Sequence, residues 1–200
     1  MLLRPGASFE LARNLQIGSA TLGDVYTFCS GLYFRGKMAY AHRFAAPPTK
    51  QAGVLVITPS RGLLSPDEWV NPEMLREFAE VDIQTAGARF AEPLITSATV
   101  LAKLSAEVVL LGSIATAKYV DVLLPILGEK LLFPSDFVGR GDMSRGALML
   151  RAAERGHELP YVPVLGSIRK GRRAPSMLTM ELRQASPAPR RGARTPSRPK

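Results

Sequence analysis

The chain has 200 residues, of which 46% are hydrophobic, so it is long enough to bury a core that folds without disulfides or a structural metal. Its single cysteine, Cys29, excludes a disulfide framework and a multi-cysteine zinc site. The net charge of +9 is unevenly placed: ten of the 26 basic residues but only one of the 17 acidic residues lie from Arg169 onward, so residues 1–168 carry 16 of each sign and balance.

This charge distribution predicts two parts. We expect a single α/β domain over residues 1–168. Residues 169–200 are expected to form a disordered basic tail, because glycine, proline, serine and arginine dominate there and cannot bury a core. The tail, rather than the balanced domain, suits nucleic-acid phosphates. No run approaches the roughly 18 apolar residues of a membrane span, and no charged-then-apolar leader opens the chain, so we expect a soluble cytoplasmic protein without a membrane partner.

In the first half of the chain, β-branched and aromatic residues at 24–29 predict the first core strand. The continuous apolar run at 53–58 predicts a second, buried strand. Between them, the spacing of apolar residues predicts a helix over 37–45. Asn71 followed by Pro72 predicts the start of the next helix, since asparagine caps helices and proline suits their first position.

We expect the rest of the chain to be organised around residues 108 to 151. Short apolar runs at 108–111 and 130–133 predict strands, and each is followed by a polar turn and by helical spacing, at 116–127 and 143–155. This repeat predicts neighbouring parallel strands joined by a right-handed crossover. We therefore expect an α/β three-layer sandwich with a mostly parallel central sheet of about four to five strands.

The flanks of this span give further expectations. Apolar residues on one face predict a helix over 93–106. Pro125 predicts a kink or an early end of its helix, and Gly156 predicts a C-terminal cap. Residues 159–168 predict a last short strand, which their prolines restrict to a sheet edge.

Four polar loops follow the four candidate strands. In a parallel sheet these loops share the edge where ligands bind. Their polar residues are Ser30, Tyr33, Arg35 and Lys37; Ser60, Arg61, Asp67 and Glu68; Ser113, Thr116 and Lys118; and the group from Ser135 to Arg145.

The turn PSDFVGRGDMSRG is the first choice for a site, because two arginines, three glycines and a helix start coincide in it. Arg140 and Arg145 are expected to hold a phosphate or carboxylate, with Ser135 beside them. If chemistry occurs, Asp136 or Asp142 is the expected acid or base. The structural alternative is an ion pair, Asp142–Arg145 or Asp136–Arg140, that only rigidifies the loop.

The turn that begins at Gly112 is a second candidate. Ser113 and Thr116 open a helix whose free N–H groups suit a phosphate or carboxylate; alternatively, Thr116 merely caps that helix. Arg61, after the second strand, completes the expected ligand-binding set. The two histidines and one cysteine have no metal-ligand spacing, so neither a metal nor a cofactor is expected.

The second turn resembles the last signature segment of the uracil-DNA glycosylase superfamily. That segment reads HPSPLS, a short gap, then RGFFGxxHFSxxNxLL; here residues 133–136 read FPSD and residues 137–148 read FVGRGDMSRGAL. The preceding VVLLGS is similar to the family's VVFLLWG strand, so the resemblance covers residues 108–151. Phe133 stands where the family has its histidine and cannot hydrogen-bond a leaving uracil. Residues 58–61, TPSR, lack the family's water-activating acid, so uracil excision is not expected.

A second resemblance covers residues 30–70. SGLYFRGKMAYAHRF and GVLVITPSRGLLSPDEWV are similar to small flavodoxin-like bacterial and phage proteins of obscure function, which carry LYxxxxFxxxxxYA and a strand ending SAKxGLLxPDE. Both resemblances imply a three-layer α/β fold with a site of nucleobase or nucleotide size at the sheet edge.

From these patterns we expect an α/β domain that binds a nucleobase or nucleotide, free or within DNA or RNA. The basic tail is expected to add salt-sensitive phosphate contacts. Two alternatives stay open: a small-molecule enzyme acting on a phosphorylated or carboxylated metabolite, and a non-catalytic partner-binding module. The sequence gives no indication of the oligomeric state.

Overall fold

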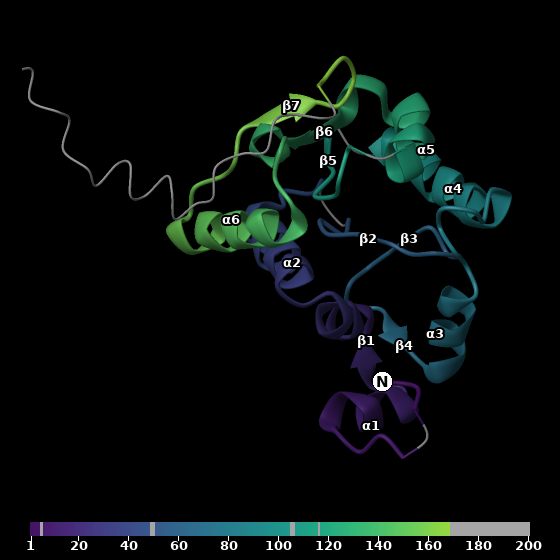
Figure 1. Cartoon of the computed structure of the whole chain (residues 1–200). Helices are drawn as coiled ribbons and strands as arrows, with labels where there is room; N and C mark the ends of the chain where they lie inside the picture. The colour runs from purple at the N-terminus through teal and green to yellow at the C-terminus, as the bar shows by residue number, and fades with distance from the viewer. Residues whose placement is uncertain (5, 49–50, 105–106, 116, 169–200) are drawn as a thin grey trace, which may run out of the picture.

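The computed structural model describes residues 1–4, 6–48, 51–104, 107–115 and 117–168 (Figure 1). The helices are α1 (Glu10–Gln16), α2 (Leu22–Phe44), α3 (Pro72–Ala79), α4 (Ala88–Leu104), α5 (Ala117–Leu127) and α6 (Asp142–Arg155). The strands are β1 (Ala20–Thr21), β2 (Val56–Ile57), β3 (Leu63–Leu64), β4 (Trp69–Val70), β5 (Val108–Val109), β6 (Leu131–Pro134) and β7 (Tyr161–Pro163). Single 3-10 turns, η1 (Gly128–Lys130) and η2 (Ser135–Phe137), flank β6. None of the helices described is long and apolar enough to cross a bilayer.

The strands form three small sheets rather than one large one. β1 pairs with β4 and β2 pairs with β3, both antiparallel. In the third sheet, β6 lies between β5, to which it is parallel, and β7, to which it is antiparallel. The expected mixture of helices and strands is confirmed. The expected mostly parallel sheet of four to five strands is wrong, because β5 and β6 are the sole parallel pair in the described part of the chain.

The largest departure from expectation is α2, which contains residues 24–29 that were predicted as a core strand. A capping box starts the helix: the Thr21 hydroxyl accepts a hydrogen bond from the Asp24 N–H at 3.2 Å, and the Asp24 carboxylate accepts one from the Thr21 N–H at 3.4 Å. The helix kinks at Gly31, whose φ of 56° favours glycine. The predicted helix over 37–45 is therefore the second half of a longer one.

Several local signals predicted helix ends correctly. The Asn71 side chain accepts a hydrogen bond from the Met74 N–H at 2.9 Å, and Pro72 is the first residue of α3. Gly156 ends α6 in the left-handed region, with φ of 66°. Pro125 is an exception, because α5 continues past it to Leu127 and does not end early at the proline. β7 lies at the edge of its sheet, as its prolines predicted.

Two glycines allow α2 and α6 to pack closely. A Cβ added to Gly36 would lie 2.5 Å from the carbonyl oxygen of Gly146, and one added to Gly146 would lie 2.9 Å from the carbonyl oxygen of Leu32. Figure 1 shows the two helices side by side. Since both contacts are with backbone atoms, only glycine fits at this crossing.

The buried side chains form two hydrophobic clusters. One joins α4, α5, α6 and the β5–β6–β7 sheet, with Leu94, Leu131 and Phe133 among its members. The other joins α1, α3, β1 and β4, with Leu22 and Val70 among its members. α2 contributes to both clusters, so it connects the two halves of the fold.

Candidate functional site

The two turns singled out from the sequence leave the same sheet edge. β5 and β6 run parallel, with Val108 opposite Leu131 and Val109 opposite Leu132. Their carboxyl ends, and the turns that follow, therefore lie at one edge of the sheet. The first expected strand is helical and the second belongs to a separate antiparallel hairpin, so an edge shared by all four loops is not formed.

The arginines of the second turn are engaged within their own segment. Arg140 donates from Nε to the backbone oxygen of Asp136 at 2.8 Å and from Nη1 to the Ser144 hydroxyl at 3.3 Å. Ser135 donates its hydroxyl to the Pro160 carbonyl at 3.4 Å. The Asp136 side chain is exposed. These contacts fold the turn on itself and tie it to the residue that precedes β7.

Arg145 is buried, with 7% of its surface exposed. It donates from Nε to the Phe137 carbonyl at 3.3 Å, and its guanidinium lies 5.6 Å from the centre of the Phe137 ring. Its Nη1 lies 3.6 Å from the carboxylate of Asp142, which is the ion pair named above as the structural alternative. Arg145 thus braces the N-terminus of α6 from inside.

Ser113 and Arg61, also expected to bind the ligand, each have a partner within their own segment or on a neighbouring helix. Ser113 is half-buried, and its hydroxyl accepts a hydrogen bond from the Ala115 N–H at 3.3 Å. Thr116 lies outside the described residues. Arg61 contacts both carboxylate oxygens of Glu77, with Nη2 at 2.5 Å from Oε2. That pair, with a hydrogen bond from Ser60, lowers the pKa of Glu77 to about 2.

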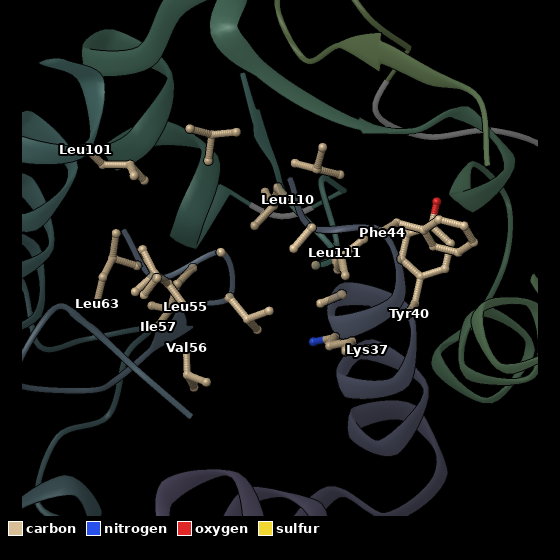
Figure 2. Close-up of a pocket in the computed structure, with 18 of the residues that line it drawn as sticks. Lys37, Tyr40, Phe44, Leu55, Val56, Ile57, Leu63, Leu101, Leu110 and Leu111 are labelled. Atoms are coloured by element: carbon tan, nitrogen blue, oxygen red, sulfur yellow. The ribbon is translucent and has the colours of Figure 1, made fainter. Parts of the chain in front are cut away.

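A cavity of about 700 Å³ lies next to this edge, between α2, the β2–β3 hairpin, β5 and α5. Residues of both hydrophobic clusters line its wall. Figure 2 shows its apolar lining, which includes Phe44, Val56, Leu63 and Leu110. A cavity of this size and character is typical of small-molecule sites.

Lys37 is the one cation among the described residues that line this cavity. Figure 2 shows its amine reaching from α2 toward the side formed by the β2–β3 hairpin. Its Nζ also lies 4.1 Å from the centre of the Tyr33 ring. Glu107 and Glu158 line the cavity too, but neither forms an ion pair with Lys37, and neither does any other acid in the described part of the chain.

The surroundings of Lys37 disfavour its charged form. The pKa of Lys37 is lowered from 10.5 to about 8, chiefly by burial; the nearby cations of Arg145 and Lys118 act in the same direction, and the carboxylate of Asp142 opposes them. Burial also disfavours the charged form of Tyr33, and it therefore raises the pKa of that hydroxyl. The Tyr33 hydroxyl donates a hydrogen bond to the Leu111 carbonyl at 3.4 Å. Lys37 therefore adjoins the N-terminus of α6, where the site was expected.

A chain of hydrogen bonds connects α2 to β7 at another part of the cavity wall. The Leu159 N–H donates to the Tyr40 hydroxyl at 2.8 Å, and the Tyr161 hydroxyl donates to the Glu158 carboxylate at 2.8 Å. The two hydroxyl oxygens lie 2.6 Å apart. Because the single hydroxyl proton of Tyr161 goes to Glu158, Tyr40 is the donor between them. This chain holds the second half of α2 in place, and Lys37 with it.

Sequence reasoning named Lys37 among the loop residues but did not expect it to bind a ligand. The helical spacing over 37–45 places Lys37 on the same helix face as Tyr40 and Phe44. This spacing could have indicated that Lys37 faces the same cavity as those two aromatic residues. No three His, Cys, Asp or Glu side chains lie together as a metal site among the residues described.

No protein-family model, curated protein sequence or solved structure matches the chain. The similarity of residues 108–151 to the uracil-DNA glycosylase superfamily, and of residues 30–70 to small flavodoxin-like proteins, therefore stays a prediction from motifs.

Proposed function

We propose that this domain binds a small molecule with an apolar body and one oxygen-bearing head group, and that the head group meets Lys37. The observation that supports it is the position of Lys37, whose amine enters a largely apolar cavity of about 700 Å³ and forms no ion pair with a described carboxylate, although that of Asp142 acts on it at longer range. This is the small-molecule alternative that the sequence left open, moved from the turn to the adjoining cavity.

The cavity suits both ends of such a ligand. Apolar side chains such as Leu63 and Leu110 favour an aliphatic or aromatic body, since its burial removes apolar surface from water. A buried ammonium is unfavourable unless it is paired, so a carboxylate or phosphate that meets Lys37 supplies the missing counter-charge. The arginines expected to do this, Arg61, Arg140 and Arg145, already have internal partners.

A thermal-shift series on the full chain tests the proposal. We expect octanoate at pH 6.5, where Lys37 is mostly protonated, to raise the melting temperature more than 1-octanol, because a ligand that binds the native state stabilises it. Lys37→Met should weaken octanoate binding roughly tenfold or more, since a hydrogen bond to a charged group contributes about 1.5–3 kcal/mol. Lys103→Met, at an exposed position of α4, is the matched control. Equal shifts in both variants, or no shift with any apolar ligand, contradict the proposal.

Nucleic-acid binding is the second candidate, and the charge distribution favours it. Ten basic residues and one acid follow from Arg169 onward, whereas the preceding 168 residues are balanced. If the tail binds phosphates, affinity of the full chain for a short single strand should fall steeply with salt. Replacing the ten basic residues with glutamine should abolish that binding. A salt-insensitive affinity that survives the replacement removes the tail from the account.

A further inference from the structure

We infer that Lys37 is a nucleophilic amine that condenses with the carbonyl carbon of an apolar aldehyde or ketone held in the cavity, forming an imine. This inference rests on the proposed function, because it uses the same cavity and the same amine; it takes the head group to be a neutral carbonyl that meets the free amine, where the proposed function also admits an anion that meets the ammonium.

The geometry supplies the two things that such a lysine needs. The first is a space in which the carbonyl compound can reach the amine. The Lys37 amine lies at the cavity wall formed by α2, and Val56, Ile57 and Leu63 lie across the cavity (Figure 2). The second is an apolar surrounding with cations nearby, which keeps part of the amine unprotonated. Both desolvation and a neighbouring cation are established ways of activating a lysine for attack on carbonyl compounds.

The groups that set this balance come from three helices. Those near the amine or on the adjoining cavity wall are Tyr26 and Tyr33 from α2, Lys118 and Tyr119 from α5, and Asp142 and Arg145 from α6. Burial is the largest influence, and Asp142 acts against the two cations. With a pKa of about 8, about one Lys37 in ten is a free amine at pH 7, on the order of 300-fold more than at the ordinary value of 10.5.

The step balances without any further reactant. The nitrogen lone pair forms a bond to the carbonyl carbon, and the carbonyl π electrons move to its oxygen. That oxygen takes up both protons lost by the amine and leaves as water, which breaks the carbon–oxygen bond and leaves a carbon–nitrogen double bond. An apolar cavity favours this product, because it limits the return of water to the imine.

Reductive trapping of the imine with cyanoborohydride tests the inference. It uses the full wild-type chain, and therefore does not depend on the folding of any variant. The chain is incubated with octanal or with glycolaldehyde over pH 6–10, then reduced with cyanoborohydride. Peptide mass spectrometry gives the extent of modification at Lys37 and at Lys103 and Lys130, the internal controls. A less basic amine is also a weaker nucleophile, which offsets part of the gain in free amine. We therefore expect octanal to modify Lys37 on the order of tenfold faster than Lys103 at pH 8.

Two features of the result separate a reactive site from general labelling. The modification rate at Lys37 should level off above about pH 8, whereas an amine with the reference lysine pKa of about 10.4 gains free amine up to pH 10 and beyond. The preference for Lys37 should shrink with glycolaldehyde, which has no apolar body to bury. Equal rates at Lys37 and Lys103 with octanal at every pH overturn the inference.

The outcomes also distinguish this inference from the proposed function. If octanoate stabilises the chain through Lys37 but octanal does not label it preferentially, the cavity binds anions only, and the imine inference falls while the proposed function stands. If neither ligand acts at Lys37, both fail. Selective labelling with octanal supports both.

Discussion

Replacing Lys37 by methionine should stabilise the folded chain at neutral pH. Methionine keeps an unbranched, flexible side chain of similar length in the cavity wall but carries no charge. The difference between the ordinary pKa of 10.5 and the value of about 8 corresponds to about 3 kcal/mol against folding at pH values below 8. The variant also loses the contact of the ammonium with the Tyr33 ring, which contributes about 0.5–1 kcal/mol. We expect a net gain of about 2 kcal/mol at pH 6.5.

The pH dependence has a definite sign. Between about pH 8 and 10.5 the unfolded chain holds a proton on Lys37 that the folded chain has released. The unfolding free energy of the wild type therefore rises with pH in this window relative to the variant. The gain from Lys37→Met should be nearly full below pH 8, fall through the window, and be lost above about pH 10.5.

Urea denaturation followed by circular dichroism measures the unfolding free energy at pH 6.5 and at pH 9.5. Lys103→Met serves as the control, and its unfolding free energy should stay within about 0.5 kcal/mol of the wild type at both pH values. A variant that is less stable than the wild type at pH 6.5, or a gain that is identical at the two pH values, would refute the reasoning about Lys37.

Three further predictions concern helix packing, a hydrogen bond and an ion pair elsewhere in the fold. Gly36→Ala should destabilise the chain by about 1–3 kcal/mol, because its new Cβ meets the backbone of Gly146, and a chemical denaturation curve would reveal a neutral change if the helices can move apart. Tyr161→Phe should cost about 1–2 kcal/mol in the same assay, since Tyr40 loses the acceptor for its hydroxyl proton; an unchanged midpoint would contradict the proposed donor direction. Glu77→Gln should cost at most about 1 kcal/mol at pH 7, as expected of a partly exposed pair, and nothing at pH 1.5, below the carboxyl pKa of about 2; a cost that persists there would come from something other than charge.

The parts of the fold that local chemistry decides were predictable. Asn71 followed by Pro72 predicted the start of α3, and Gly156 predicted the end of α6. The repeated strand, turn and helix after residue 108 correctly predicted that β5 and β6 are parallel neighbours. In each case the signal lies within a few residues of the feature that it specifies.

The parts that failed depend on contacts between distant segments. Residues 24–29 have strand-like side chains, but the capping box at Thr21 and the packing of α2 against α6 through Gly146 make them helical. Once this segment is helical, the large parallel sheet loses a strand, and the loop expected to carry Ser30, Tyr33 and Arg35 becomes part of α2. Arg145 was expected to face a ligand, but its burial beside Phe137 depends on how α6 packs, which its neighbours in sequence do not specify.

The most direct test of the account is the titration of Lys37 itself, followed by NMR of lysine methylene carbons with and without octanoate. We expect a lysine resonance with a midpoint at about pH 8 that is absent from Lys37→Met and that moves upward when octanoate binds. A spectrum in which every lysine titrates near its ordinary value of 10.5, and in which octanoate moves none of them, would contradict it.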